Sequence, residues 1–197
     1  MSDTLYEKSN TGDDGNASIG PGANWEGQTF TPTIQHTITS VKLYLHRDDG
    51  VLPGTVTVSI RATAASLPTG ADLVSGTYNA DSLTPFTPTW VEFTFGAGTM
   101  LLANTKYAKV IRVSSATDQV KSSVTNPGTY ADGSSVYSGD SGASWAAYGG
   151  SPPFDYQFEE YGIPLPGEGM SVLFFYGETL HYVSHTGVEY AIQGTPA

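Results

Sequence analysis

The sequence contains no cysteine. This absence excludes disulfide bonds, thiolate metal sites and thiol nucleophiles together. Long apolar runs are also missing: none approaches the roughly 18 residues that a membrane-spanning helix needs. The first ten residues, MSDTLYEKSN, lack the basic segment and apolar core of a secretory signal, so the sequence predicts no signal peptide.

Charged residues are scarce, and bases are scarcer than acids. Only 14% of residues are charged, and 8 Lys and Arg against 19 Asp and Glu give a formal net charge of −11. This balance repels phosphate backbones and anionic lipids, so we expect neither nucleic acid nor membrane as a partner.

The acids are scattered over predicted loops, where their oxygens could bind calcium. None follows the spacing of an EF-hand loop. We therefore expect no cofactor, with a structural calcium ion as the open alternative. The loop acids in question are Asp13, Asp14, Asp48, Asp49, Asp132 and Asp140.

The most regular pattern lies between residues 54 and 76. There Val56, Val58 and Ile60 alternate with polar residues, and a period of two predicts a half-buried strand. The sequence LPTG at 67–70 predicts the turn of a hairpin, because Pro fixes φ and Gly allows the chain to reverse. We expect this hairpin in the middle of a sandwich.

Further strands are predicted along the chain, and no segment has the apolar spacing of a helix longer than a turn. A chain of 197 residues with 23 Gly and 12 Pro suits one all-β domain with many turns. We expect an antiparallel, jelly-roll-like β-sandwich over residues 1–162, with 1–23 as a lead-in. Trp25 and Trp90 are expected in its core, and GAG at 96–98 as a turn. The predicted strands cover 5–6, 25–31, 38–46, 77–78, 90–95, 101–102, 107–113, 122–124, 135–137 and 154–158.

Residues 163–169 are rich in Pro and Gly and predict a linker to a C-terminal β-meander at 170–197, with turns at 177–178 and 185–187. A piece this small cannot bury the run VLFFY by itself, so we expect it to dock on the sandwich or to mediate oligomerisation. The candidate protein-contact residues are Val172, Phe174, Phe175, Tyr176, Tyr182 and Tyr190.

The strand segments WEGQTFTPTIQHTITSVKLYL, GTVTVSIRATAASLPTGADLVSG, WVEFTFGAGTMLLANTKYAKVIRV and FDYQFEEYG resemble the choice-of-anchor R type β-sandwich domain. That family occurs in bacterial and archaeal surface proteins and in phage structural proteins. The resemblance covers about residues 24–162 and implies a sandwich without established catalytic residues. In place of a cell-surface anchor stands the meander, which resembles strand-turn-strand pieces of phage fibre and head-decoration proteins.

One segment resembles a catalytic motif. GDSG at 139–142 is similar to the nucleophile loop of chymotrypsin-like proteases, but ASW follows it instead of Gly-Pro. None of the four histidines, His36, His46, His181 and His185, stands in the Ala-Ala-His context of that family. His181 and His185 do not converge on a metal either, because their segment is predicted as strand and turn. We expect no enzyme.

The aromatic residues of a Gly- and Ser-rich region are the remaining candidates for a binding role. Tyr137, Trp145 and Tyr148 are expected at one end of the sandwich, together with Tyr130. Exposed aromatics there can stack on a sugar ring or fill a gap in a neighbouring subunit, and we rank protein contact above sugar.

The sequence therefore favours a non-enzymatic structural protein of a phage particle, either a capsid-decoration (cement) or a fibre-associated protein. Its partners would be other virion proteins and copies of itself, with a trimer favoured, and its location the virion. The alternative is a carbohydrate-binding surface or adhesion module with a glycan as ligand. Whether the meander packs on its own chain or on another stays open.

Overall fold

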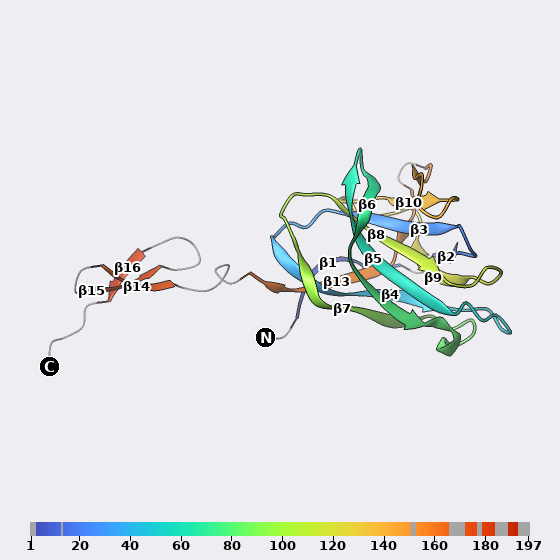
Figure 1. The fold of residues 1–197 in the computed structure, drawn as a ribbon, viewed down its shortest axis with the longest axis horizontal. Coiled ribbons are helices and arrows are strands. Elements are labelled where there is room, and N and C mark those ends of the chain that lie inside the picture. Colours follow the sequence, from blue (N-terminus) through green and yellow to red (C-terminus); the bar gives the residue numbers. More distant parts are fainter. Residues whose placement is uncertain are drawn as a thin grey trace. The chain divides into compact units, whose positions relative to one another are not determined.

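The computed structural model describes residues 3–12, 14–150, 153–165, 172–176, 179–183 and 189–192. The chain divides into two compact units, Met1–Ile163 and Pro164–Ala197. Among the described residues there is no α-helix, and the one helical turn is the 3-10 element η1 (Ala80–Ser82). The first unit consists of two antiparallel sheets packed together, which confirms the predicted all-β sandwich (Figure 1).

One layer of the sandwich is a seven-stranded sheet. Its main path runs through β1 (Thr4–Ser9), β13 (Phe158–Pro164), β4 (His36–His46), β9 (Val120–Thr125) and β12 (Asp155–Tyr156). Two strands lie off this path: β2 (Gly15–Ile19) pairs with β9, and β7 (Thr89–Leu101) pairs with β4.

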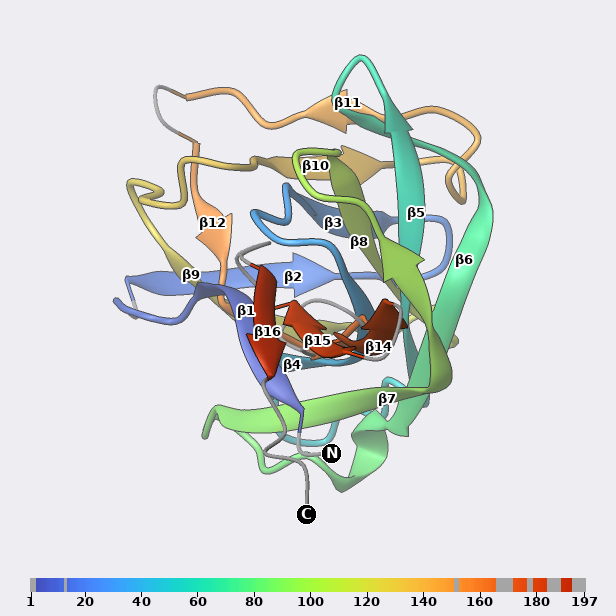
Figure 2. The same ribbon diagram turned by 90° about the vertical axis from the view of Figure 1, so that its left-hand side faces the viewer.

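The other layer is a six-stranded sheet, which Figure 2 shows beside the first. Its order is β11 (Ala146–Ala147), β10 (Ser135–Ser138), β3 (Trp25–Phe30), β8 (Tyr107–Val113), β5 (Thr55–Ala64) and β6 (Leu67–Asn79). Strands β6 and β7 meet at the margin of the two sheets. A Cβ atom on Gly76 would lie 2.6 Å from the carbonyl oxygen of Thr94, so only glycine permits this close approach.

The core lies between the sheets and follows the predicted alternation. Val56, Val58 and Ile60 of β5 are fully buried, as are Val41 and Leu43 of β4. Each such side chain contributes roughly 1.5–3 kcal/mol through burial. The apolar residues that the sequence placed on one face of β5 and of β4 are therefore buried together in the core.

The core also encloses a polar group. Nε2 of the fully buried His36 lies 2.7 Å from Oε1 of Glu160, and its Nδ1 lies 2.8 Å from the carbonyl oxygen of Ile34. Because a carbonyl only accepts, Nδ1 donates to Ile34, and one proton is shared between Nε2 and the carboxyl. Burial lowers the pKa of His36, but the bond and charge of Glu160 outweigh it, and the net change is a rise.

The organising hairpin differs from its prediction in two ways. Its turn is Ala65–Ser66, with φ of 50° and 63°, whereas residues 67–70 belong to β6, where Thr69 pairs with Ala62. Positive φ at both turn residues matches the twist of the flanking strands, and Pro68 fits because β6 is an edge strand. The predicted turn and the central position of the hairpin are therefore both wrong.

Residues 96–98 also do not form the predicted turn. β7 continues through them, with a register shift opposite Ile38 and Ser40. Gly98 has φ of 73°, and a Cβ atom there would clash with the carbonyl oxygen of Ile38. These glycines form a bulge in a continuous strand instead of ending it.

Trp90 lies outside the predicted core. Its side chain is 38% exposed and packs on Tyr44, with ring centroids 5.1 Å apart. The neighbouring Val91 is buried, and successive strand residues face opposite sides, so Trp90 is on the outer face of the seven-stranded sheet.

The strands differ from the sequence prediction in three further places. β2 was not predicted, the segment at 154–158 is divided between β12 and β13, and β13 continues through Ile163 and Pro164. The first two residues of the predicted linker therefore belong to β13, directly after Gly162, which pairs with Thr4 of β1.

The second unit contains a three-stranded antiparallel meander of β14 (Val172–Tyr176), β15 (Thr179–Val183) and β16 (Glu189–Ile192). Its predicted turns, at 177–178 and 185–187, lie outside the described residues. Across the part of the chain that the structure describes, no helix is long and apolar enough to cross a membrane.

Candidate functional site

Four neighbouring strands of the six-stranded sheet bring a tryptophan and three charged residues together on its outer face. Trp25 begins β3, Arg112 lies in β8, Arg61 in β5 and Asp72 in β6. Arg112 follows the buried Ile111, and Arg61 follows the buried Ile60, so both arginines point away from the core.

Asp72 joins the two arginines. Nε of Arg61 donates to its Oδ1 and Nη2 of Arg112 to its Oδ2, each at 2.7 Å, while Nη1 of Arg112 donates to Ser59 at 2.9 Å. Burial raises the pKa of Asp72, but the bonds to both arginines outweigh it and the net pKa is lowered. Asp72 is therefore ionised at neutral pH.

Trp25, which the sequence predicted in the core, instead lies on the outer face and packs against both guanidinium groups. The central carbon of Arg61 lies 5.4 Å from the indole ring and that of Arg112 lies 5.0 Å from it, within the range of cation–π attraction. The ring, the two arginines and Asp72 form a rigid platform, which we call the tryptophan–arginine face.

The loop after β10 folds onto this face. Oδ1 of Asp140 accepts from the hydroxyl of Ser138 at 2.7 Å and from the backbone N–H of Ser144 at 2.8 Å. Bonds from Ser144 and Ser138 lower the pKa of Asp140 to about 2. A Cβ atom on Gly142 would lie 2.7 Å from Cζ3 of Trp25, so the loop needs glycine to approach the indole.

This geometry explains the GDSG sequence at 139–142. Its carboxylate orders the loop, as the predicted turn requires, and Ser141 takes a φ of 59° within that turn. The described histidines of the sandwich, His36 and His46, both lie in β4 of the other sheet. Within the described sandwich, no imidazole is positioned to activate Ser141.

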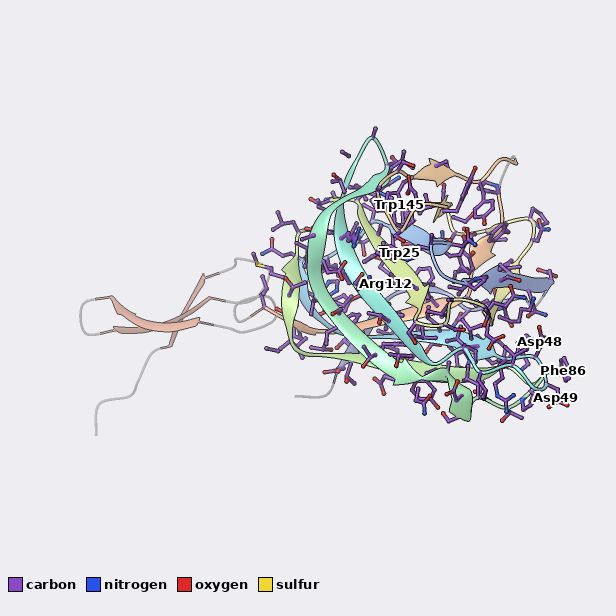
Figure 3. The ribbon with its side chains drawn as sticks, turned by 45° about the vertical axis from the view of Figure 1, so that its right-hand side comes forward. Trp25, Asp48, Asp49, Phe86, Arg112 and Trp145 are labelled. Atoms are coloured by element: carbon purple, nitrogen blue, oxygen red, sulfur yellow. The ribbon has the colours of Figure 1, made fainter. Side chains whose placement is uncertain are left out.

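Between this loop and the tip of the β5–β6 hairpin lies a hollow of about 280 Å³. Trp145 is half-buried at its edge, and its indole N–H has no hydrogen-bond partner among the described residues. Figure 3 shows Trp145 beside Trp25 and Arg112. The principal lining residues are Arg61, Ala64, Leu67, Pro68, Ser144 and Trp145.

Tyr137 and Tyr148 lie elsewhere, so the three predicted ligand contacts do not form one site. Their ring centroids are 4.7 Å apart, and the hydroxyl of Tyr148 donates to Glu26 at 2.9 Å and 3.1 Å. The hydroxyl of Tyr156 donates to the same carboxyl at 3.0 Å. Glu26 lies next to Trp25 in β3 and therefore faces the interior, where burial raises its pKa to about 7 although both tyrosine bonds lower it.

The predicted protein-contact residues all lie in the meander. Leu173 pairs with Tyr182, which pairs with Tyr190. This register places Phe175, Tyr182 and Tyr190 on one face of the small sheet and Val172, Phe174 and Tyr176 on the other.

The predicted calcium ligands do not gather. Asp49 accepts from the N–H of Gly50, Asp14 accepts from that of Asn126, and Asp48 lies 3.8 Å from Nζ of Lys121. Asp132 lies in the loop before β10, where its carbonyl accepts from Thr31, and Asp13 is outside the described residues. Where side chains are described, no group of three or more histidines or acids could hold a metal ion.

The sequence identified Trp145 as a candidate ligand contact but did not identify the arginines that share the site with it. Arg61 and Arg112 each occur on the polar side of a predicted strand, which is a weak local signal of an outward-facing cation. Nothing in the chain order indicates that their strands are neighbours or that residues 139–145 fold over them.

No protein-family model matches the chain, and no curated protein is found to match it. The resemblance to the choice-of-anchor R domain remains a prediction, and the function is argued from the geometry alone.

Proposed function

We propose that the chain is a non-enzymatic recognition protein whose sandwich binds carbohydrate in the hollow between Trp145 and Arg61. The observation that supports this proposal is the pairing, in one hollow, of a half-buried indole with a guanidinium group. Sugar rings have apolar faces that stack on aromatic side chains and hydroxyls that hydrogen-bond to polar ones.

The size and rigidity of the hollow support the same conclusion. Its 280 Å³ is at the small end of ligand pockets and suits one ring of a larger glycan. Asp72 fixes Arg61, and Asp140 fixes the loop that carries Trp145. A site whose side chains are already held loses little conformational entropy on binding.

This proposal ranks carbohydrate binding above protein contact, whereas the sequence favoured protein contact. Tyr148 is hydrogen-bonded to Glu26 and packs on Tyr137, which is 40% exposed, and neither tyrosine lines the hollow. Trp145 is the predicted ligand contact that lines a hollow.

A glycan array, followed by titration of the strongest hit, tests the proposal. Trp145→Ala is expected to weaken binding at least about tenfold, because it removes the stacking surface. The matched control is Trp90→Ala, which removes an exposed indole from the other sheet and should leave binding unchanged. If the wild-type protein binds no glycan on the array, the proposal is wrong.

A second candidate function is the structural role in a phage particle, as a capsid-decoration or fibre-associated protein. The meander supports it, because the sequence of its three short strands is rich in large apolar residues, which a sheet of this size has little room to bury. Phe86 adds to this: it is 65% exposed, has a φ of 55°, and its N–H donates to the carbonyl of Arg47. Figure 3 shows it beside Asp48 and Asp49. Partners would be other virion proteins and further copies of the chain, with a trimer favoured.

A further inference from the structure

We infer that the hollow selects sugars that carry a carboxylate, with the guanidinium of Arg61 as the group that recognises it. This inference rests on the proposed carbohydrate-binding function and names the class of sugar. Its basis is the hydrogen bonding of the two arginines on the tryptophan–arginine face.

The two arginines differ in which of their guanidinium N–H donors are free of hydrogen bonds. Arg112 uses Nη1 on Ser59 and Nη2 on Asp72. Arg61 uses Nε on Asp72, and within the described residues no hydrogen bond engages its two Nη atoms. Arg61 also lines the hollow, whereas Arg112 does not.

Free donors on a fixed guanidinium suit a carboxylate. The planar group presents parallel N–H bonds that match the two oxygens of a carboxylate, and such charge-assisted pairs are roughly twice as strong as neutral hydrogen bonds. The bond to Asp72 and the contact with Trp25 hold the guanidinium in place before a ligand arrives.

The charge around the hollow is close to balanced, whereas the whole chain is acidic, so the selectivity rests on the free N–H donors of Arg61. Only 8 residues of the chain are Lys or Arg, and two of them meet here with one carboxylate, Asp72, between them. The nearby Asp140 accepts hydrogen bonds from Ser138 and Ser144, which lower its pKa to about 2, so it is ionised and offsets one of the two guanidinium charges. More distant acids are screened beyond about 8 Å at physiological ionic strength.

Trp145 supplies the other half of the recognition. Its side chain lines the hollow, while its indole N–H is buried and has no partner among the described residues. A sugar acid offers both groups that this site needs, a ring face for the indole and a carboxylate for Arg61.

The experiment compares three probes that differ at one position: an alkyl β-glucuronide, the corresponding β-glucoside and the methyl ester of the glucuronide. Binding is measured by calorimetry on the full chain at about 150 mM salt. We expect the glucuronide to bind at least about tenfold more tightly than the other two. Arg61→Gln should remove this preference, so that the glucuronide and the glucoside bind with affinities within about threefold of each other.

Two further variants complete the design. Arg61→Lys keeps the charge but not the planar pair of donors, and should lose most of the preference. Lys8→Gln removes an exposed cation from β1 of the other sheet and should change nothing. The ester comparison needs no variant, so the result does not depend on whether the Arg61 variants fold.

The outcomes separate this inference from the function on which it rests. Equal binding of glucuronide and glucoside overturns the inference and leaves the carbohydrate function intact. The inference is also overturned if Arg61→Lys keeps the preference for glucuronide, or if that preference appears only at low salt. Either result would mean that the protein attracts the carboxylate by charge in general. If none of the three sugars binds and the glycan array is also empty, the carbohydrate function itself fails.

Discussion

Lys109 lies between the two sheets, where a charged amine is costly. It is fully buried, and Nζ is 3.0 Å from the ring centroid of Phe158 and 4.4 Å from that of Phe30. No described residue gives Nζ a hydrogen bond. Burial holds the pKa of Lys109 well below its usual value, although the charge of Glu160 opposes this.

We expect Lys109→Met to stabilise the protein by about 1–3 kcal/mol, because it replaces an unpartnered buried amine with an apolar chain of similar length. Urea unfolding measures the change. Lys8→Met, at an exposed position, should alter stability by less than about 0.5 kcal/mol. A loss of stability in Lys109→Met would mean that the amine makes a compensating interaction in the folded state.

Glu26 makes the stability of the folded protein depend on pH, and the direction of that dependence follows from its pKa. Its folded pKa of about 7 exceeds the ordinary value of 4.5, so the folded state holds this proton more tightly than the unfolded state. The stability that the group contributes is complete below pH 4.5 and is lost as the pH rises through 7.

Because glutamine mimics the protonated carboxyl, Glu26→Gln should differ little from wild type at pH 4.5 and become relatively more stable toward pH 7 and above. The difference should approach about 3 kcal/mol at most. Melting curves of both proteins across this range measure it. Parallel pH profiles would show that Glu26 is solvated in the folded state.

At the scale of elements, the β5–β6 hairpin turns at residues poorly suited to its geometry. Ala65 and Ser66 both have positive φ, which side-chain-bearing residues adopt at a cost. Asn-Gly is the favoured pair for this two-residue turn.

We therefore expect the double change Ala65→Asn and Ser66→Gly to stabilise the sandwich by roughly 1 kcal/mol, as measured by thermal unfolding. The matched control is Ser75→Gly, within β6 and without positive φ, which should destabilise by roughly 0.5–1 kcal/mol. If both variants lose stability equally, the strain at this turn is not relieved by glycine.

At the scale of the molecule, the sandwich should fold without the meander. β13 lies between β1 and β4 in the seven-stranded sheet and ends at Pro164, so a chain of residues 1–165 keeps every described strand of the sandwich. A chain of residues 1–157 lacks β13, including the buried Phe158 and Glu160, and is expected not to fold.

Light scattering on the full chain and on 1–165 tests whether the meander drives assembly. We expect an oligomeric full chain and a folded monomer for 1–165, because the apolar residues of the meander require a partner surface. If both are folded monomers, the structural role in a particle loses its support from self-association.

Local sequence pattern was enough to predict the all-β class and the strand that carries the inward-facing Val56, Val58 and Ile60. Alternation is a local property: each residue's face follows from its neighbour's, and burial of one face fixes the phase. The three-stranded meander followed from the same pattern.

Only the tertiary structure decided what depends on which strands are neighbours. GAG at 96–98 suits a turn and a bulge equally, and it is a bulge because β4 pairs with β7 on both sides of it. Trp90 has the strand environment of a core residue and is exposed because its side chain lies on the outer face of the sandwich. Arg61, Arg112 and Trp25 meet because β3, β8 and β5 are adjacent, and pairing between strands distant in sequence is not encoded in local periodicity.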